Sequence, residues 1–286
     1  MKQNVMKLML LLCIGVACLV LLVVFAREFS GREEQPQPTE SQITVQTSEV
    51  TEPSETVLPT ETTGPALKAN PFTADDFAMD GQWMSCVTAE FRLGIDVSKY
   101  QGEIDWEQVA AAGIRFAIIR VGGRGYGQAG NLFADETAQK NYEGAKAAGL
   151  QVGAYFFSQA ISPEEAVEEA EYTLDQIKSW ELDLPVVYDW EYISETARTA
   201  NTDAKTVTAC AEAFCNWITR TGLDAMLYVR PESQMLDLET LAAYKRWVAL
   251  YSETMDYPHQ FTMWQYTKTG KVPGINGDVD INIYLP

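Results

Sequence analysis

Histidine is almost absent from this chain of 286 residues, in which His259 is the only one. Serine and cysteine nucleophiles usually depend on a histidine base, and zinc sites usually need histidines or closely spaced cysteines. The five cysteines include no C-x-x-C pair, and Cys210 and Cys215 should lie about 140° apart around one helix. We therefore expect no Ser–His or Cys–His catalysis, no metal site, no cofactor and no disulfide scaffold.

Basic residues are also scarce, with 21 Lys and Arg against 40 Asp and Glu and a formal charge of −19. Binding to nucleic acid depends on Lys and Arg, so a nucleic-acid partner is excluded. The acidic excess by itself indicates only solubility. The chain is 47% hydrophobic and 11% aromatic, which is enough for a real core.

Charge is missing entirely from Leu8 to Ala26, a nearly continuous apolar run. At about 1.5 Å per residue, this run would span roughly 28 Å, close to the thickness of a bilayer core. Lys2 and Lys7 precede it and favour an N-terminus inside the cell. We expect residues 1–26 to be a single-pass anchor, or a signal peptide cleaved after Ala26. Both interpretations place the rest of the chain outside the cell membrane.

Aromatic and basic residues are absent from Gln35–Ala66, which is almost entirely Ser, Thr, Pro, Glu and Gln. Such a composition cannot bury enough apolar surface to offset the chain entropy. We therefore predict a disordered linker over residues 27–72, followed by a transition segment over residues 73–90.

Residues 91–286 alternate short apolar runs with helical patterns, as one α/β domain would. One expected helix begins at Ser162-Pro163-Glu164-Glu165, and another runs from about Val207 to Gly222. The expected strands are Leu93–Val97, Phe116–Val121, Val152–Phe157, Pro185–Trp190, Ala225–Val229, Trp247–Leu250, Thr262–Tyr266 and Val279–Tyr284. The pattern predicts a compact (β/α) barrel with about eight strands and fewer than eight full helices.

The strand ending in Val187-Tyr188-Asp189-Trp190-Glu191 carries the most informative motif. Side chains alternate along a strand, so Asp189 and Glu191 should share one face. Two carboxyl groups that close cannot both ionise freely, so one pKa should rise. An acid with a raised pKa beside a carboxylate is what glycosidic bond cleavage requires. A solvated turn with two acids is the alternative.

Two further strand ends carry acids, Asp96 and Asp280. In a barrel of this kind, active residues lie at strand ends on one face, so these acids should converge with Asp189 and Glu191. The alternative is that Asp96 caps a turn and Asp280 binds a backbone amide. Aromatic side chains, which could stack on sugar rings, are frequent near the same ends. We expect Tyr100, Tyr155, Tyr188, Tyr228 and Trp264 to contact substrate, and assign Trp247 to the core.

Gly125–Gly130 matches G-x-G-x-x-G, the pattern of dinucleotide-binding loops. The acidic residue expected near the end of the next strand is missing, since Ser158 and Gln159 stand there. We therefore predict a flexible rim loop and no nucleotide cofactor.

Several short motifs follow one another along the predicted domain. The opening Gly94-Ile95-Asp96-Val97-Ser98-Lys99-Tyr100-Gln101-Gly102 is followed by Ile104-Asp105-Trp106, Ile119-Arg120, Gly153-Ala154-Tyr155 and Asp189-x-Glu191. The series closes with Trp247-Val248-Ala249, Trp264-Gln265-Tyr266 and Val279-Asp280-Ile281-Asn282. In this order the motifs resemble glycoside hydrolase family 25 lysozymes, and the resemblance covers about residues 92–284. Phe156-Phe157 departs from it, where many members carry a histidine after the tyrosine.

The resemblance implies a flattened barrel and an N-acetylmuramidase that cuts the β-1,4 bond after N-acetylmuramic acid in peptidoglycan. By position, Glu191 would be the general acid, with Asp189, Asp96 and Asp280 ionised around it, and Gln265 would join the substrate-contacting residues. We expect a monomer on the outer face of a bacterial membrane, with peptidoglycan glycan strands as its partner. A non-catalytic glycan-binding module and a glycosidase for another amino-sugar polymer are the alternatives.

Overall fold

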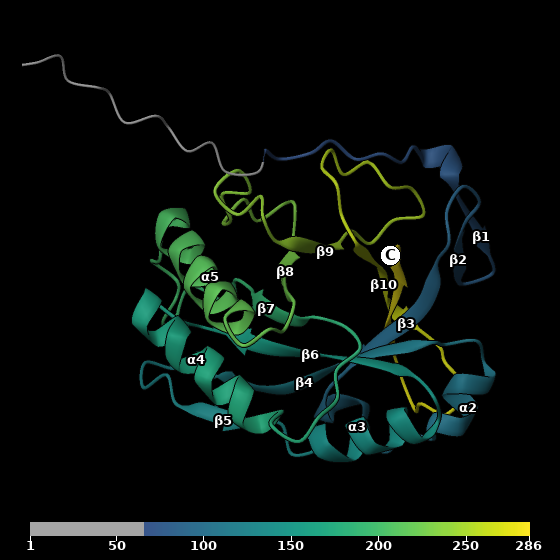
Figure 1. Ribbon diagram of the computed structural model, residues 1–286, viewed down its shortest axis with the longest axis horizontal. Helices are drawn as coiled ribbons and strands as arrows, with labels where there is room; N and C mark the ends of the chain where they lie inside the picture. The colour runs from purple at the N-terminus through teal and green to yellow at the C-terminus, as the bar shows by residue number, and fades with distance from the viewer. Residues whose placement is uncertain (1–65) are drawn as a thin grey trace, which may run out of the picture. The chain divides into compact units, whose positions relative to one another are not determined.

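A computed structural model describes residues 66–286, which form an α/β barrel (Figure 1). Within these residues, a sheet closes on itself because β3 pairs with both β11 and β4. Its strands are β3 (Arg92–Val97), β4 (Phe116–Arg124), β6 (Gln151–Ser158), β7 (Val186–Trp190), β8 (Ala225–Val229), β9 (Lys245–Ala249), β10 (Met263–Gly270) and β11 (Val279–Tyr284). All eight expected strands are therefore present, and the predicted fold class is confirmed.

Strand β11 is antiparallel to both of its neighbours, whereas the other barrel strands pair in parallel. The beginning of β11 consequently lies at the edge where the parallel strands end. Asp280, the second residue of β11, is directly opposite Asp96 in the register with β3. This inversion brings an acid from the start of a strand to the edge where the parallel strands end.

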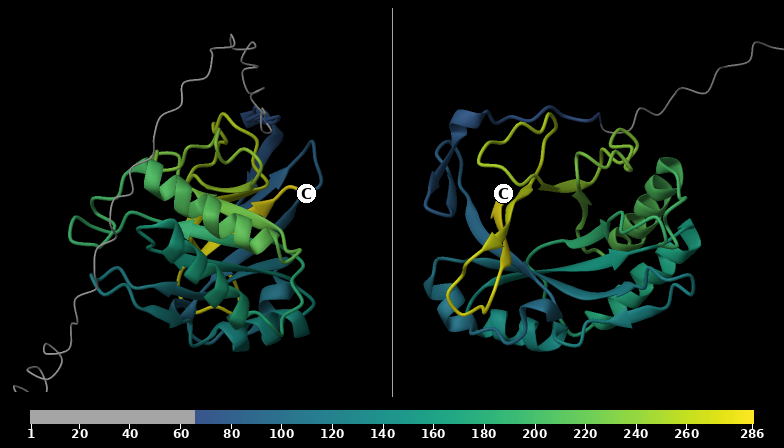
Figure 2. Two further views of the ribbon diagram at one scale, coloured as in Figure 1. Left: turned by 60° about the vertical axis from the view of Figure 1, so that its left-hand side comes forward. Right: turned by 180° about the vertical axis from the view of Figure 1, so that it is seen from behind.

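The described helices cover only part of the barrel wall (Figures 1 and 2). They are α2 (Trp106–Ala111), α3 (Ala138–Ala147), α4 (Pro163–Gln176) and α5 (Ala204–Thr219). Helix α4 begins as predicted, with Pro163 in its first turn and the Ser162 side chain accepting a bond from the Glu165 amide. No helix connects β8 to β9 or β9 to β10. Loops therefore cover the wall there.

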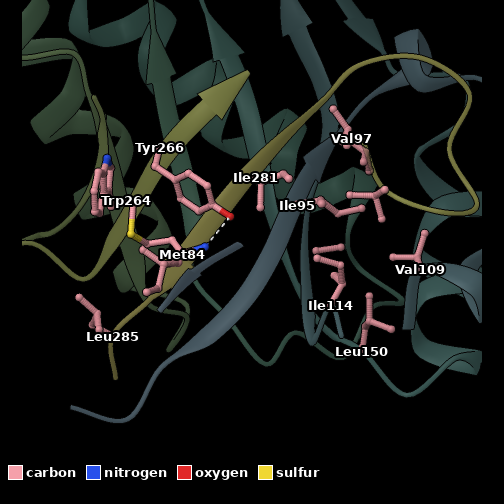
Figure 3. Packing of buried hydrophobic residues seen from close by; sticks show 14 of the residues in the cluster. Met84, Ile95, Val97, Val109, Ile114, Leu150, Trp264, Tyr266, Ile281 and Leu285 are labelled. Atoms are coloured by element: carbon pink, nitrogen blue, oxygen red, sulfur yellow. Dashed lines mark hydrogen bonds between the residues drawn. The ribbon is translucent and has the colours of Figure 1, made fainter. Parts of the chain in front are cut away.

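The predicted transition segment is part of the folded unit and not a separate region. It forms a hairpin of β1 (Phe77–Asp80) and β2 (Trp83–Cys86), and the Phe77 ring lies 5.2 Å from that of Trp264. Figure 3 shows Met84, which is fully buried, beside Tyr266, whose hydroxyl accepts a 3.3 Å bond from the Met84 amide.

The end of the predicted linker also pairs with the barrel. Lys68 and Asn70 exchange backbone hydrogen bonds with Gln260 and Pro258. The folded unit thus begins before residue 70. The domain start at residue 91 is corrected for this reason.

The glycine-rich segment Gly125–Gly130 connects two antiparallel strands, β4 and β5 (Leu132–Ala134). A dinucleotide loop would open directly into a helix at this point, so the hairpin agrees with our rejection of that motif. At the end of this segment, Gly130 lies close to the Arg198 guanidinium, and its carbonyl accepts a bond from Arg124.

Among residues 66–286, no helix is long and apolar enough to cross a membrane. The predicted anchor and most of the predicted linker lie outside the described residues. Cys86, Cys210 and Cys215 are buried and unpaired, as predicted for the last two.

Candidate active site

Four carboxyl groups from three regions of the chain line one pocket at the end of the barrel. Its volume is about 140 Å³, and its lining residues are Asp96, Tyr155, Asp189, Glu191, Tyr228, Trp247, Tyr251, Gln265 and Asp280. Asp189 is the fourth residue of β7, and Glu191 follows the last. The alternation of side chains along this strand places both on the pocket side, as expected.

Asp96 is held by two side-chain amides. Gln265 Nε2 and Asn282 Nδ2 donate to Asp96 Oδ2 at 2.8 and 2.9 Å. The Gln265 oxygen accepts from the hydroxyls of Tyr228 and Tyr251 at 2.8 and 3.0 Å. These bonds fix both ends of the Gln265 amide, so its nitrogen faces Asp96. The network orients Asp96 before any ligand binds.

Glu191 lines the pocket and forms an ion pair with an arginine. Its Oε2 lies 3.0 Å from Nη1 of Arg230, which follows β8 and also pairs with Glu232. Its backbone carbonyl accepts a 3.0 Å bond from the side chain of the fully buried Gln159. With 28% of its side chain exposed, Glu191 is accessible to a ligand in the pocket.

The other three acids have raised pKa values. Burial raises the pKa of Asp96 and of Asp189 well above its ordinary value, and neighbouring carboxylates add to the effect. Burial and then Glu191 raise the pKa of Asp280 to about 6. The expectation of ionised aspartates is therefore not supported for Asp96 and Asp189 in the unliganded site.

The surroundings of Asp189 agree with its raised pKa. Its Oδ1 is buried without a hydrogen-bond partner among the described residues. Burying an ionised oxygen without a partner costs much more free energy than burying a neutral carboxyl group. The pKa values of Asp96, Asp189 and Asp280 thus depend on burial and on the neighbouring carboxyl groups, so these aspartates do not titrate independently.

Three of the expected substrate-contacting residues, Tyr155, Tyr228 and Gln265, line the pocket. Trp247, which we assigned to the core, is only 2% exposed but also lines it. Tyr100 does not line the pocket. It is 78% exposed and its ring lies over the Arg120 guanidinium, 5.1 Å from centroid to Cζ.

Tyr188 and Trp264 are corrected to core residues. Both are fully buried on the outer side of the barrel wall. Tyr188 packs against Phe214 of α5, and Trp264 packs against Phe77 of the hairpin. Neighbouring residues in a strand face opposite sides, so a position near a strand end was not enough to place these rings in the pocket.

Sequence reasoning missed Tyr251 and Arg230. Each comes within two residues after a predicted strand, so the rule that used strand ends for acids would also have selected them. Among residues 66–286, no group of three or more His, Cys, Asp or Glu side chains is arranged to hold a metal ion.

The sequence model described as "Glycosyl hydrolases family 25" matches residues 95–275, which contain three of the four acids. The chain belongs to this family. Asp280 lies just beyond the matched range.

Two curated relatives of the family 25 chain are lysozymes by name. Lysozyme M1 of Streptomyces globisporus is 30% identical over 201 residues, which cover 66% of each chain. The autolytic lysozyme of Clostridium acetobutylicum is 26% identical over 191 residues, which cover 66% of this chain and 54% of the relative. The chain thus spans between about half and two thirds of these relatives.

Solved structures agree on the fold. A bacterial lysozyme from Streptomyces coelicolor is 29% identical with a TM-score of 0.54, covering 68% of this chain and 91% of that one. The modular autolysin LytC of Streptococcus pneumoniae, solved with a synthetic peptidoglycan ligand, is 24% identical with a TM-score of 0.59. That match covers 68% of this chain and 47% of LytC.

Proposed function

We propose that this chain is a peptidoglycan hydrolase that cleaves the β-1,4 bond between N-acetylmuramic acid and N-acetylglucosamine. The observation that carries the proposal is the gathering of Asp96, Asp189, Glu191 and Asp280 in one pocket of a family 25 barrel. Two relatives with lysozyme names support the choice of substrate.

Glu191 is the proposed proton donor to the leaving glycosidic oxygen. It follows the end of β7 and is partly exposed, whereas Asp96 and Asp189 are 7% and 6% exposed. A donor must come within hydrogen-bond reach of the leaving oxygen, and the more exposed acid is the better placed. In the unliganded site Glu191 Oε2 lies 3.0 Å from Arg230 Nη1, and this contact must open for that oxygen to reach the glycosidic oxygen.

The three aspartates would stabilise positive charge that develops on the sugar during cleavage. Asp96, fixed by Gln265 and Asn282, needs no rearrangement to do so. Protons that the cluster holds in the free enzyme would redistribute when a substrate enters, since each acid affects the titration of its neighbours.

Replacement of Glu191 by Gln tests the proton donor. We expect hydrolysis of purified sacculi to fall by about 10²-fold or more, because general acid catalysis contributes about 10²- to 10⁴-fold. Glu195→Gln, an exposed position on the same loop, is the matched control. Turbidity clearing at the wild-type rate by Glu191→Gln would remove Glu191 from this role.

Mass spectrometry of the fragments identifies the bond. Muramic acid at the new reducing ends is the expected result. N-acetylglucosamine at those ends would contradict the proposed bond, and tight retention on cell wall without any fragments would favour a glycan-binding module.

We also propose that the enzyme acts as a monomer outside the cell membrane, held there by residues 8–26 or secreted after cleavage. The support is the uncharged run Leu8–Ala26 behind Lys2 and Lys7. Fractionation of cells that express the full chain, with N-terminal sequencing of the mature protein, separates the two forms. Light scattering of the solubilised protein gives its mass.

A further inference from the structure

A second cavity lies outside the barrel wall, where no helix connects β8 to β9 or β9 to β10. Its volume is about 320 Å³, more than twice that of the catalytic pocket, and the loop after β8 and residues 257–259 enclose it. This size lies at the lower end of the range for small-molecule sites. Trp190, Met235, Leu236 and Leu238 give it an apolar surface.

The cavity adjoins the catalytic pocket. Tyr228 contributes to the lining of both. Arg230 lines the cavity while its Nη1 lies 3.0 Å from Glu191 Oε2 in the catalytic pocket. Trp190 stands between Asp189 and Glu191 in the chain and also lines the cavity. A substituent on a sugar beside Glu191 could therefore enter the cavity past one arginine side chain.

The charge of the cavity differs from that of the rest of the protein. Its lining holds Arg230 and His259 but no carboxylate, although the chain has a formal charge of −19. The neighbouring pocket, by contrast, holds four acids. Arg230 pairs with Glu191 and Glu232, and its guanidinium has five N–H donors, so some remain available to a ligand.

Two lining residues have polar atoms without partners. Trp190 Nε1 and the Tyr257 hydroxyl are buried and form no hydrogen bond within residues 66–286. Buried polar groups are nearly always paired, so each such atom needs an explanation. Gln234, in the loop after β8, has a backbone φ of 51°, a value that residues other than glycine rarely adopt. Unpartnered donors and backbone strain are both features of ligand sites.

We propose that this cavity is a subsite for the peptide substituent on the muramic acid of peptidoglycan, with the peptide's carboxylate near Arg230 and His259. This inference rests on the proposed function. A peptide suits the cavity because its apolar side chains match Met235, Leu236 and Leu238, and its carboxylate matches Arg230.

The test compares two polymers from the same sacculi, one with its peptides and one from which an amidase has removed them. We expect the full-length enzyme to show a kcat/KM about ten-fold higher on the peptide-bearing polymer. A few additional contacts between the peptide and the cavity are enough to give a factor of this size. Met235→Trp, which fills the cavity, should bring the ratio to within about two-fold of one. Met235→Leu, which roughly conserves volume, should keep the wild-type ratio.

His259→Ala provides a second variant in case Met235→Trp does not fold, and it should also lower the ratio. A wild-type ratio near one, or a ratio that neither Met235→Trp nor His259→Ala changes, would overturn the subsite. Failure of the wild-type enzyme to cleave either polymer would instead overturn the proposed hydrolase function, and the subsite with it.

Discussion

Replacing Asp280 by Asn should stabilise the protein at neutral pH and impair it as an enzyme. Burial and the nearby Glu191 carboxylate raise the pKa of Asp280 from 3.8 to about 6. An acid whose pKa is higher in the folded state gives up a proton less readily there than in the unfolded chain. Its ionisation therefore costs stability as pH rises from about 4 to about 6. Asparagine has nearly the same shape and cannot ionise, so it removes this cost.

The size of the effect follows from the same shift. A rise from 3.8 to about 6 corresponds to at most about 3 kcal/mol, at about 1.4 kcal/mol per pH unit. Asp280 is half-buried, and solvent screens part of the interaction, so we expect a gain of about 1–2 kcal/mol at pH 8. For a domain of this size, that gain raises Tm by roughly 2–8 °C. At pH 4 the gain should vanish.

Thermal unfolding followed by circular dichroism from pH 4 to pH 8 measures the difference. Asp224→Asn is the matched control, since Asp224 pairs with Lys245 on the surface and its side chain is 66% exposed. Such an exposed pair contributes between about 0 and 1 kcal/mol. A variant at Asp280 that is no more stable than wild type at pH 8, or equally stabilised at pH 4, would refute this account of the cluster.

Three further substitutions test how the site is supported. Gly130→Ala should lower the free energy of unfolding by about 1–3 kcal/mol in urea titrations, because its φ is +55° and an added Cβ would lie 2.4 Å from the Arg198 guanidinium; an unchanged midpoint would contradict this. Arg124→Met should lower the free energy of unfolding by about 3–5 kcal/mol, because the buried Glu169 loses its ion-pair partner. A second substitution, Glu169→Leu, should restore much of this loss. Additive losses in the double-mutant cycle would speak against the pairing. Phe77→Ala should lower the free energy of unfolding by about 3 kcal/mol, because it removes a buried ring that packs on Trp264. A calorimetric Tm equal to that of wild type would show that the hairpin does not stabilise the barrel.

Local patterns were enough to predict most of the secondary structure. Strand β8 and strand β11 have the expected limits, and helix α4 begins at the predicted cap. These elements follow from short apolar runs and from a capping residue next to a proline, which act over a few neighbouring residues. The hairpin at residues 77–86 was missed because its alternation is short and its stability comes from contacts with Trp264 and Tyr266, far along the chain.

The candidate acids could also be named from the sequence, because Asp96, Asp189, Glu191 and Asp280 all adjoin predicted strands. The protonation states of these acids could not be predicted from the sequence. Which acid holds a proton depends on burial and on distances between carboxyl groups, and both arise only when the strands close into a barrel. The pKa of Asp280, for example, is raised by burial and by Glu191, which is remote in the chain.

The positions of the aromatic side chains also depended on the tertiary structure. The order of residues in the sequence showed that tyrosines and tryptophans lie near the strand ends. It did not distinguish Tyr228, which lines the pocket, from Tyr188, which packs on α5. The sequence by itself determined the order of the elements, the family and the acids that could react. Only the tertiary structure decided which side chains face inward and that antiparallel β11 delivers Asp280 beside Asp96, because strand direction and register depend on contacts between distant segments.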